Sequence, residues 1–80
     1  MKAKIHVTLK DGVLDPQGKA VSHALKSLGF DEFKEVRQGK YIEIDFRDVS
    51  RATAKQRAEE MCKKLLANVV IENYDIEIEA

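Results

Sequence analysis

The sequence predicts a single α+β domain, residues 1–80, in which two helices cover one face of a four-stranded antiparallel sheet. Stretches of alternating apolar and polar residues indicate strands, and stretches of helical period lie between them in the order β-α-β-β-α-β. Turn residues separate these stretches, and no repeat, linker or low-complexity segment interrupts them. This order is typical of a ferredoxin-like sandwich, with the strand order 4-1-3-2.

The four predicted strands share a pattern in which every second residue is apolar. The first strand covers residues 2–10, and the last covers residues 74–79. Residues 33–38 show a weaker pattern, and Gly39 is expected to supply the positive φ of a hairpin that leads into residues 41–47. Opposite charges on neighbouring strands are expected to pair across the exposed face of the sheet.

The start of the first helix is well specified by the sequence. Asp15 is a typical N-cap, and Pro16 fits the first helical position, where its missing N–H costs nothing. Gly29 is expected to end the helix as the residue after the C-cap. Gly18 lies within the helix, where glycine lowers helix stability by about 1 kcal/mol relative to alanine. A glycine at this position therefore suggests a structural requirement, such as the close approach of another backbone segment.

The second helix is predicted to begin after Ser50 and to end near Asn68. Its apolar residues recur at helical spacing and form one stripe, consisting of Ala54, Ala58, Met61, Cys62, Leu65 and Leu66. The first helix carries a stripe of its own, consisting of Ala20, Val21, Ala24, Leu25 and Leu28. Both helices are therefore expected to bury one stripe each against the same face of the sheet.

Composition excludes several classes of protein. The 14 Lys and Arg residues balance 14 Asp and Glu residues, so no overall field attracts nucleic acid. The single cysteine cannot form an internal disulfide. No stretch has the length of a membrane span, and the N-terminal residues lack the apolar run of a signal peptide. We therefore expect a cytoplasmic protein that contacts neither nucleic acid nor membrane.

The residue pattern does not indicate a catalytic or metal site. Cys62 lies on an apolar helical stripe, and His6 and His23 have no zinc-ligand spacing. The helix start could hold a phosphate, but the Asp15 carboxylate would occupy the donors and repel an anion. An RNA platform would need stacking aromatics, and only Tyr41 is available on the exposed sheet face. Unpaired sheet edges instead favour self-association.

Four segments resemble the PurS family, the small subunit of phosphoribosylformylglycinamidine synthase (FGAM synthase). They read VLDPQGKAV, VRQGKYIE, EMCKKLLAN and VIENY, and they occur in family order over almost the whole chain. The resemblance implies a non-catalytic bridging subunit in purine biosynthesis, which forms a homodimer or homotetramer. Its expected partners are a glutaminase subunit and a large synthetase subunit.

The resemblance also implies where the chemistry of the complex takes place. The complex would convert formylglycinamide ribonucleotide, glutamine and ATP to FGAM, and this chain would assist assembly and ammonia transfer. The catalytic cysteine, the ATP and its magnesium belong to the partners, so no catalytic residue, cofactor or metal is expected in this chain. A closed path is needed because free ammonia would be protonated and lost to water.

Eight positions that match the family patterns are candidate subunit contacts. They are Asp15, Pro16, Gln17, Gly18, Arg37, Gly39, Lys40 and Tyr41. A helix cap and a hairpin turn would explain most of them equally well. The long side chains of Arg37, Lys40 and Tyr41 are expected to project from the tip of the predicted hairpin. The alternative function is a free-standing ferredoxin-like regulatory module that binds a small metabolite.

Overall fold

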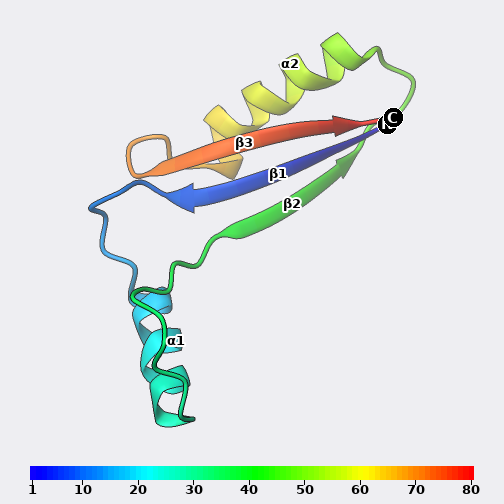
Figure 1. The fold of residues 1–80 in the computed structure, drawn as a ribbon. Coiled ribbons are helices and arrows are strands. Elements are labelled where there is room, and N and C mark those ends of the chain that lie inside the picture. Colours follow the sequence, from blue (N-terminus) through cyan, green and yellow to red (C-terminus); the bar gives the residue numbers. More distant parts are fainter.

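The computed structural model describes residues 1–80 and contains three strands and two α-helices (Figure 1). In chain order the elements are β1 (Lys2–Leu9), α1 (Pro16–Ser27), β2 (Lys40–Asp45), α2 (Arg51–Met61) and β3 (Glu72–Glu79). The predicted α+β class is confirmed. The predicted four-stranded ferredoxin-like sheet is wrong, because the sheet has three strands.

The sheet is antiparallel, with β1 between β2 and β3. Cross-strand charge pairing is confirmed on its polar face, where Lys4 pairs with Glu79 and Lys2 lies 3.4 Å from Glu43. Lys2 lies opposite both Asp45 and Glu79. The two chain termini are consequently side by side, at the end of the sheet far from α1 (Figure 1).

The predicted strand at residues 33–38, and with it the predicted hairpin, is wrong. The backbone N–H of Gln38 donates to the side chain of Asp15, 2.9 Å away, instead of to a neighbouring strand. Gly39 does not have a positive φ, in contrast to Gly12 and Gly29, whose φ angles are 83° and 98°. This segment therefore serves as a connection between α1 and β2.

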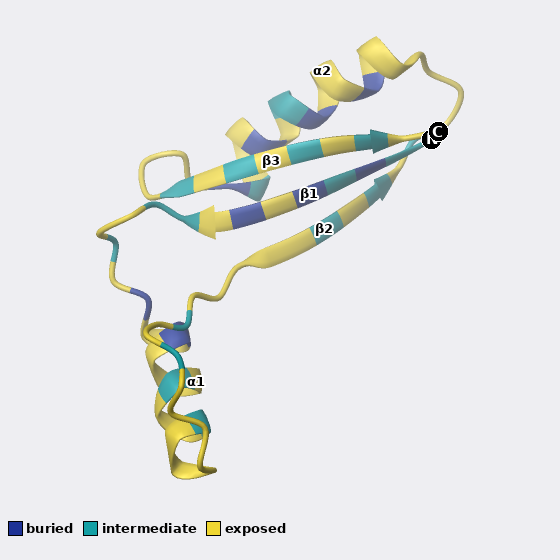
Figure 2. Ribbon diagram, in the orientation of Figure 1, coloured by how far each residue is buried: buried dark blue, intermediate teal, exposed yellow.

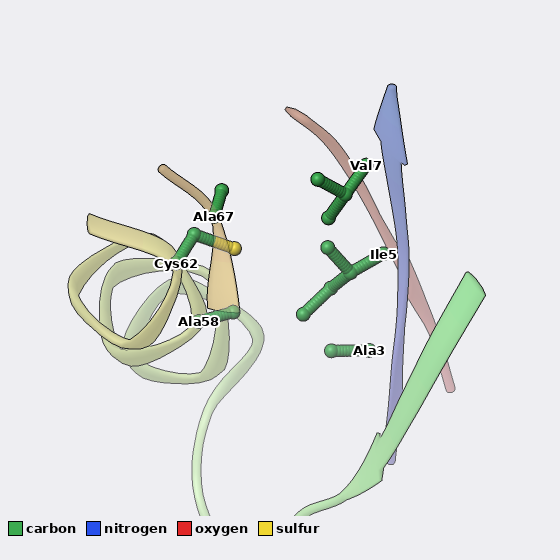
Figure 3. Packing of buried hydrophobic residues seen from close by; sticks show 6 residues of the cluster. All are labelled: Ala3, Ile5, Val7, Ala58, Cys62 and Ala67. Atoms are coloured by element: carbon green, nitrogen blue, oxygen red, sulfur yellow. The ribbon is translucent and has the colours of Figure 1, made fainter. Parts of the chain in front are cut away.

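The core lies between β1 and α2, on one face of the sheet (Figure 3). The Ser50 hydroxyl accepts from the backbone N–H of Thr53 at 3.1 Å, which confirms the predicted start of α2. A π-helical turn, Cys62–Leu66, follows α2. The buried cluster consists of Ala3, Ile5, Val7, Ala58, Cys62 and Ala67.

Helix α1 projects away from the sheet, so the prediction that both helices cover it is wrong for α1 (Figure 1). The molecule measures 49 × 25 × 15 Å along its principal axes. Gly18 is the only buried residue of α1 (Figure 2). Two connecting segments, residues 10–15 and 34–39, join α1 to the sheet, and we call them the neck.

Candidate functional site

Asp15 ties the start of α1 to the second segment of the neck. One carboxylate oxygen accepts from the N–H of Gly18 at 2.8 Å, and the other accepts from the N–H of Gln38 at 2.9 Å. These hydrogen bonds, with that from Gln38 the stronger influence, lower the pKa of Asp15 because they stabilise its charged form. Asp15 is only 6% exposed. It acts as the predicted N-cap and, in addition, as a link between two remote segments.

Arg37 ties the same segment to the end of β1. Its guanidinium donates to the carbonyl oxygens of Val13 at 3.2 Å, Lys10 at 3.1 Å and Leu9 at 3.4 Å. It also lies 3.5 Å from the carboxylate of Glu35. The planar donor array of arginine can serve several acceptors at once. Arg37 therefore links the two segments of the neck by hydrogen bonds. Its predicted position at the projecting tip of a hairpin is wrong.

Two glycines allow the backbone to pack closely in the neck. A Cβ atom on Gly18 would overlap the carbonyl oxygen of Val36 and the Asp15 carboxylate. A Cβ atom on Gly39 would overlap the carbonyl oxygen of Val7. This close approach explains why a glycine occupies position 18 inside a helix, because only glycine fits there without displacing a carbonyl group.

The remaining candidate residues lie at the edges of the neck. Pro16 occupies the first turn of α1, and Gln17 accepts from the side-chain amide of Gln38 at 3.1 Å. Lys40 donates to the carbonyl oxygen of Leu66 at 3.3 Å. The side chains of Gln17 and Lys40 are thus engaged within the chain. Contact of these three residues with other subunits stays a prediction.

Tyr41 lies on the polar face of the sheet. Its hydroxyl donates to the Glu43 carboxylate at 2.7 Å, which raises the pKa of Tyr41 and lowers that of Glu43. The ring of Tyr41 lies 4.8 Å from that of His6. The structure brings Asp15, Arg37 and Gly39 together in the neck, and Gly18 packs against it from the first turn of α1, whereas Tyr41 is on the sheet.

An apolar stripe on α1 is exposed to solvent. It consists of Ala20, Val21, Ala24 and Leu28, and Leu28 is 74% exposed. Leu25, the remaining residue of the predicted stripe, is half-buried. The chain that follows α1 returns along one side of the helix (Figure 1). The helical spacing predicts this stripe from the sequence, but it does not show that no other part of the chain packs against it.

A second apolar surface lies between α2 and β2. A hollow of about 400 Å³ is lined by the apolar side chains of Ile44, Met61, Leu65 and Leu66, with charged residues at its rim. Leu65 is 83% exposed. The sequence places Met61 and Leu65 on the buried stripe of the second helix, but both side chains are exposed in the structure.

The single cysteine of the chain is not activated as a nucleophile. Cys62 is fully buried in the core, and burial raises the pKa of its thiol, which disfavours the nucleophilic thiolate. No three His, Cys, Asp or Glu side chains are grouped so that they could hold a metal ion. No helix has the length and apolar character needed to cross a membrane.

The PurS family model, described as phosphoribosylformylglycinamidine (FGAM) synthase, matches residues 2–80. The chain belongs to the PurS family. The PurS subunit of FGAM synthase from Synechocystis sp. is 52% identical over 77 residues, which cover 96% of this chain and 77% of that protein. The resemblance to PurS inferred from the sequence is therefore confirmed.

Solved PurS structures share the fold. The crystal structure of PurS from Methanocaldococcus jannaschii, a subunit of formylglycinamide ribonucleotide amidotransferase, has a TM-score of 0.86 at 46% identity. It covers 98% of this chain and 94% of that one. A chain in the structure of PurLQS from Thermotoga maritima has a TM-score of 0.84 at 28% identity, with coverages of 95% and 93%.

Proposed function

We propose that this chain is the non-catalytic bridging subunit of an FGAM synthase complex. PurS is a subunit of FGAM synthase, an enzyme of purine biosynthesis. The observation that carries the proposal is a PurS match over nearly the whole chain, which includes a relative found in a PurLQS structure. A buried thiol of raised pKa and a side-chain network engaged in the neck support a structural role for this chain.

The proposed partners are a glutaminase subunit and a large synthetase subunit. The glutaminase would release ammonia, and the synthetase would use it with ATP and magnesium to convert formylglycinamide ribonucleotide to FGAM. A bridging subunit would hold the two centres so that ammonia passes between them without being protonated in bulk water. On this proposal the chain binds no cofactor itself and works in the cytoplasm.

We further propose that the chain acts as a homodimer or homotetramer. Its radius of gyration is 15.9 Å, whereas a compact domain of this length would have about 12 Å. Only 9 of its 80 residues are buried, which is a small core for an independent monomer. An elongated chain with so little core is expected to gain stability from a second copy.

The two exposed apolar surfaces are suited to each other. The stripe on α1 is convex and carries small residues around Val21 and Leu28, and the surface beside α2 is a hollow lined by Leu65 and Leu66. If α1 of each copy enters the hollow of the other, the contact is reciprocal and closes a dimer with two-fold symmetry. Two such dimers would make the tetramer.

Reconstitution with purified glutaminase and synthetase subunits tests the bridging role. We expect that leaving out this chain abolishes glutamine-dependent FGAM synthesis, because ammonia is no longer delivered. Synthesis with added ammonium salt should continue, because the synthetase retains its own chemistry. Equal glutamine-dependent rates with and without the chain would contradict the proposal.

The homo-oligomer is tested by Leu28→Glu, which places a charge on the exposed stripe. We expect analytical ultracentrifugation to show a monomer, since burial of an unpaired carboxylate against an apolar surface is unfavourable. Val70→Glu is the matched control, because Val70 is 78% exposed and lies outside both apolar surfaces. An unchanged sedimentation coefficient for Leu28→Glu would refute the α1 contact.

A further inference from the structure

A groove lies between α1 and the segment that returns along it. Its volume is about 620 Å³, and its basic lining consists of Lys19, His23, Lys26, Lys34 and Arg37. Lys19, His23 and Lys26 follow one another at spacings of four and three residues and therefore share one side of α1. This side faces away from the apolar stripe that contains Val21 and Leu28.

The acidic residues of the groove are already engaged. Asp15 accepts two backbone hydrogen bonds, and Glu35 pairs with Arg37 at 3.5 Å. In contrast, the side chains of Lys19 and Lys34 form no ion pair or hydrogen bond, and Lys26 only lies over the ring of Phe33, 5.8 Å from its centroid. The chain as a whole has a net charge of zero, so the groove concentrates uncompensated positive charge.

The arrangement of the lysines indicates the shape of the ligand. Lys19 and Lys26 are separated by about 10 Å along the helix axis, because each residue of an α-helix rises about 1.5 Å. About three residues of an extended chain span this distance. A compact phosphate would instead need donors that converge on one point, and the N–H of Gly18 is already bound to Asp15.

We infer that this basic groove docks an acidic segment of one of the two enzyme subunits. The inference rests on the proposed bridging function and adds the surface through which the bridge is made. Carboxylates spaced along an extended segment match Lys19 and Lys26, which lie about 10 Å apart along α1, and the open form of the groove admits a polypeptide. One side of α1 would thus contact a second copy, and the other side would contact an enzyme.

The triple variant Lys19→Gln, Lys26→Gln, Lys34→Gln tests the inference. A matched control replaces Arg47, Lys55 and Lys63 with Gln, because these exposed residues lie outside the groove and the control removes the same charge. Binding of each variant to purified glutaminase and synthetase subunits is measured by calorimetry at about 50 and about 300 mM salt. Circular dichroism and ultracentrifugation check that fold and oligomer are retained.

We expect the groove variant to bind one enzyme subunit about tenfold more weakly at low salt, since each exposed pair contributes roughly a factor of two. The control should bind like the wild type, and the difference should shrink at high salt. Equal binding of both variants would overturn the inference but leave the bridging function intact. Failure of the wild type to bind either subunit would overturn both. If the wild type and the control bind ATP and the groove variant does not, the groove binds a phosphate ligand, and the inference is overturned as well.

Discussion

Gly18→Ala is the sharpest test of the neck. The new methyl group would overlap the carbonyl oxygen of Val36 and the carboxylate of Asp15, so the returning segment must move or the cap must open. Such overpacking costs about 1–3 kcal/mol. Alanine is favoured over glycine inside a helix by about 1 kcal/mol. The net effect expected is a loss of up to about 2 kcal/mol, opposite in sign to the intrinsic helix preference.

The assay is urea denaturation followed by circular dichroism, at one protein concentration because association changes apparent stability. Lys19→Ala is the control, since Lys19 is the next residue, is exposed, and has a helix preference close to that of alanine. The control should leave the free energy of unfolding almost unchanged. A Gly18→Ala protein as stable as the wild type, or more stable, would refute the close packing of the neck.

Three further predictions concern the neck and the core. The pKa of Asp15 is lowered in the folded chain, so its stabilising effect is present above the unfolded value of about 4 and is lost as the pH falls below it. The stability difference between wild type and Asp15→Asn should therefore shrink between about pH 7 and about pH 3 in urea titrations, and a constant difference would contradict this. Ile5→Ala should reduce the free energy of unfolding by about 2–5 kcal/mol in the same assay, because Ile5 is fully buried, whereas exposed Val70→Ala should change it by less than about 0.5 kcal/mol. Cys62 should react with a thiol-specific disulfide reagent, followed by absorbance, only after denaturation, and rapid reaction of the folded chain would show that it is accessible.

Local signals in the sequence were sufficient for most elements. Alternation predicts β1 and β3, and the capping residues Asp15 and Ser50 fix the first residues of both helices. These signals act over a few residues and are complete within the sequence itself. The predicted relative order of the three observed strands is also confirmed, since β1 lies between β2 and β3. Charged residues of β1 pair with opposite charges on both neighbouring strands in this order.

Contacts between residues far apart in the sequence explain why the fold differs from the prediction at residues 33–38. Residues 33–38 have a weak strand pattern, but Asp15 and Arg37 bind the backbone of the neck and remove this segment from the sheet. Nothing in the sequence around Asp15 or Arg37 indicates that its side chain binds a backbone group more than twenty residues away. The amphipathic pattern of α1 shows that the helix needs a cover, but it cannot show whether the cover comes from the same chain.

The adjacent chain termini permit a different way of building the molecule. Lys2 and Glu79 are paired across β1 and β3, at the end of the sheet opposite α1 (Figure 1). A short glycine linker could join the ends, and new ends could be opened in the exposed turn near Val70. Such a circular permutant would keep α1, the neck and the sheet. It would also allow two copies to be fused in tandem without placing a linker against either side of α1.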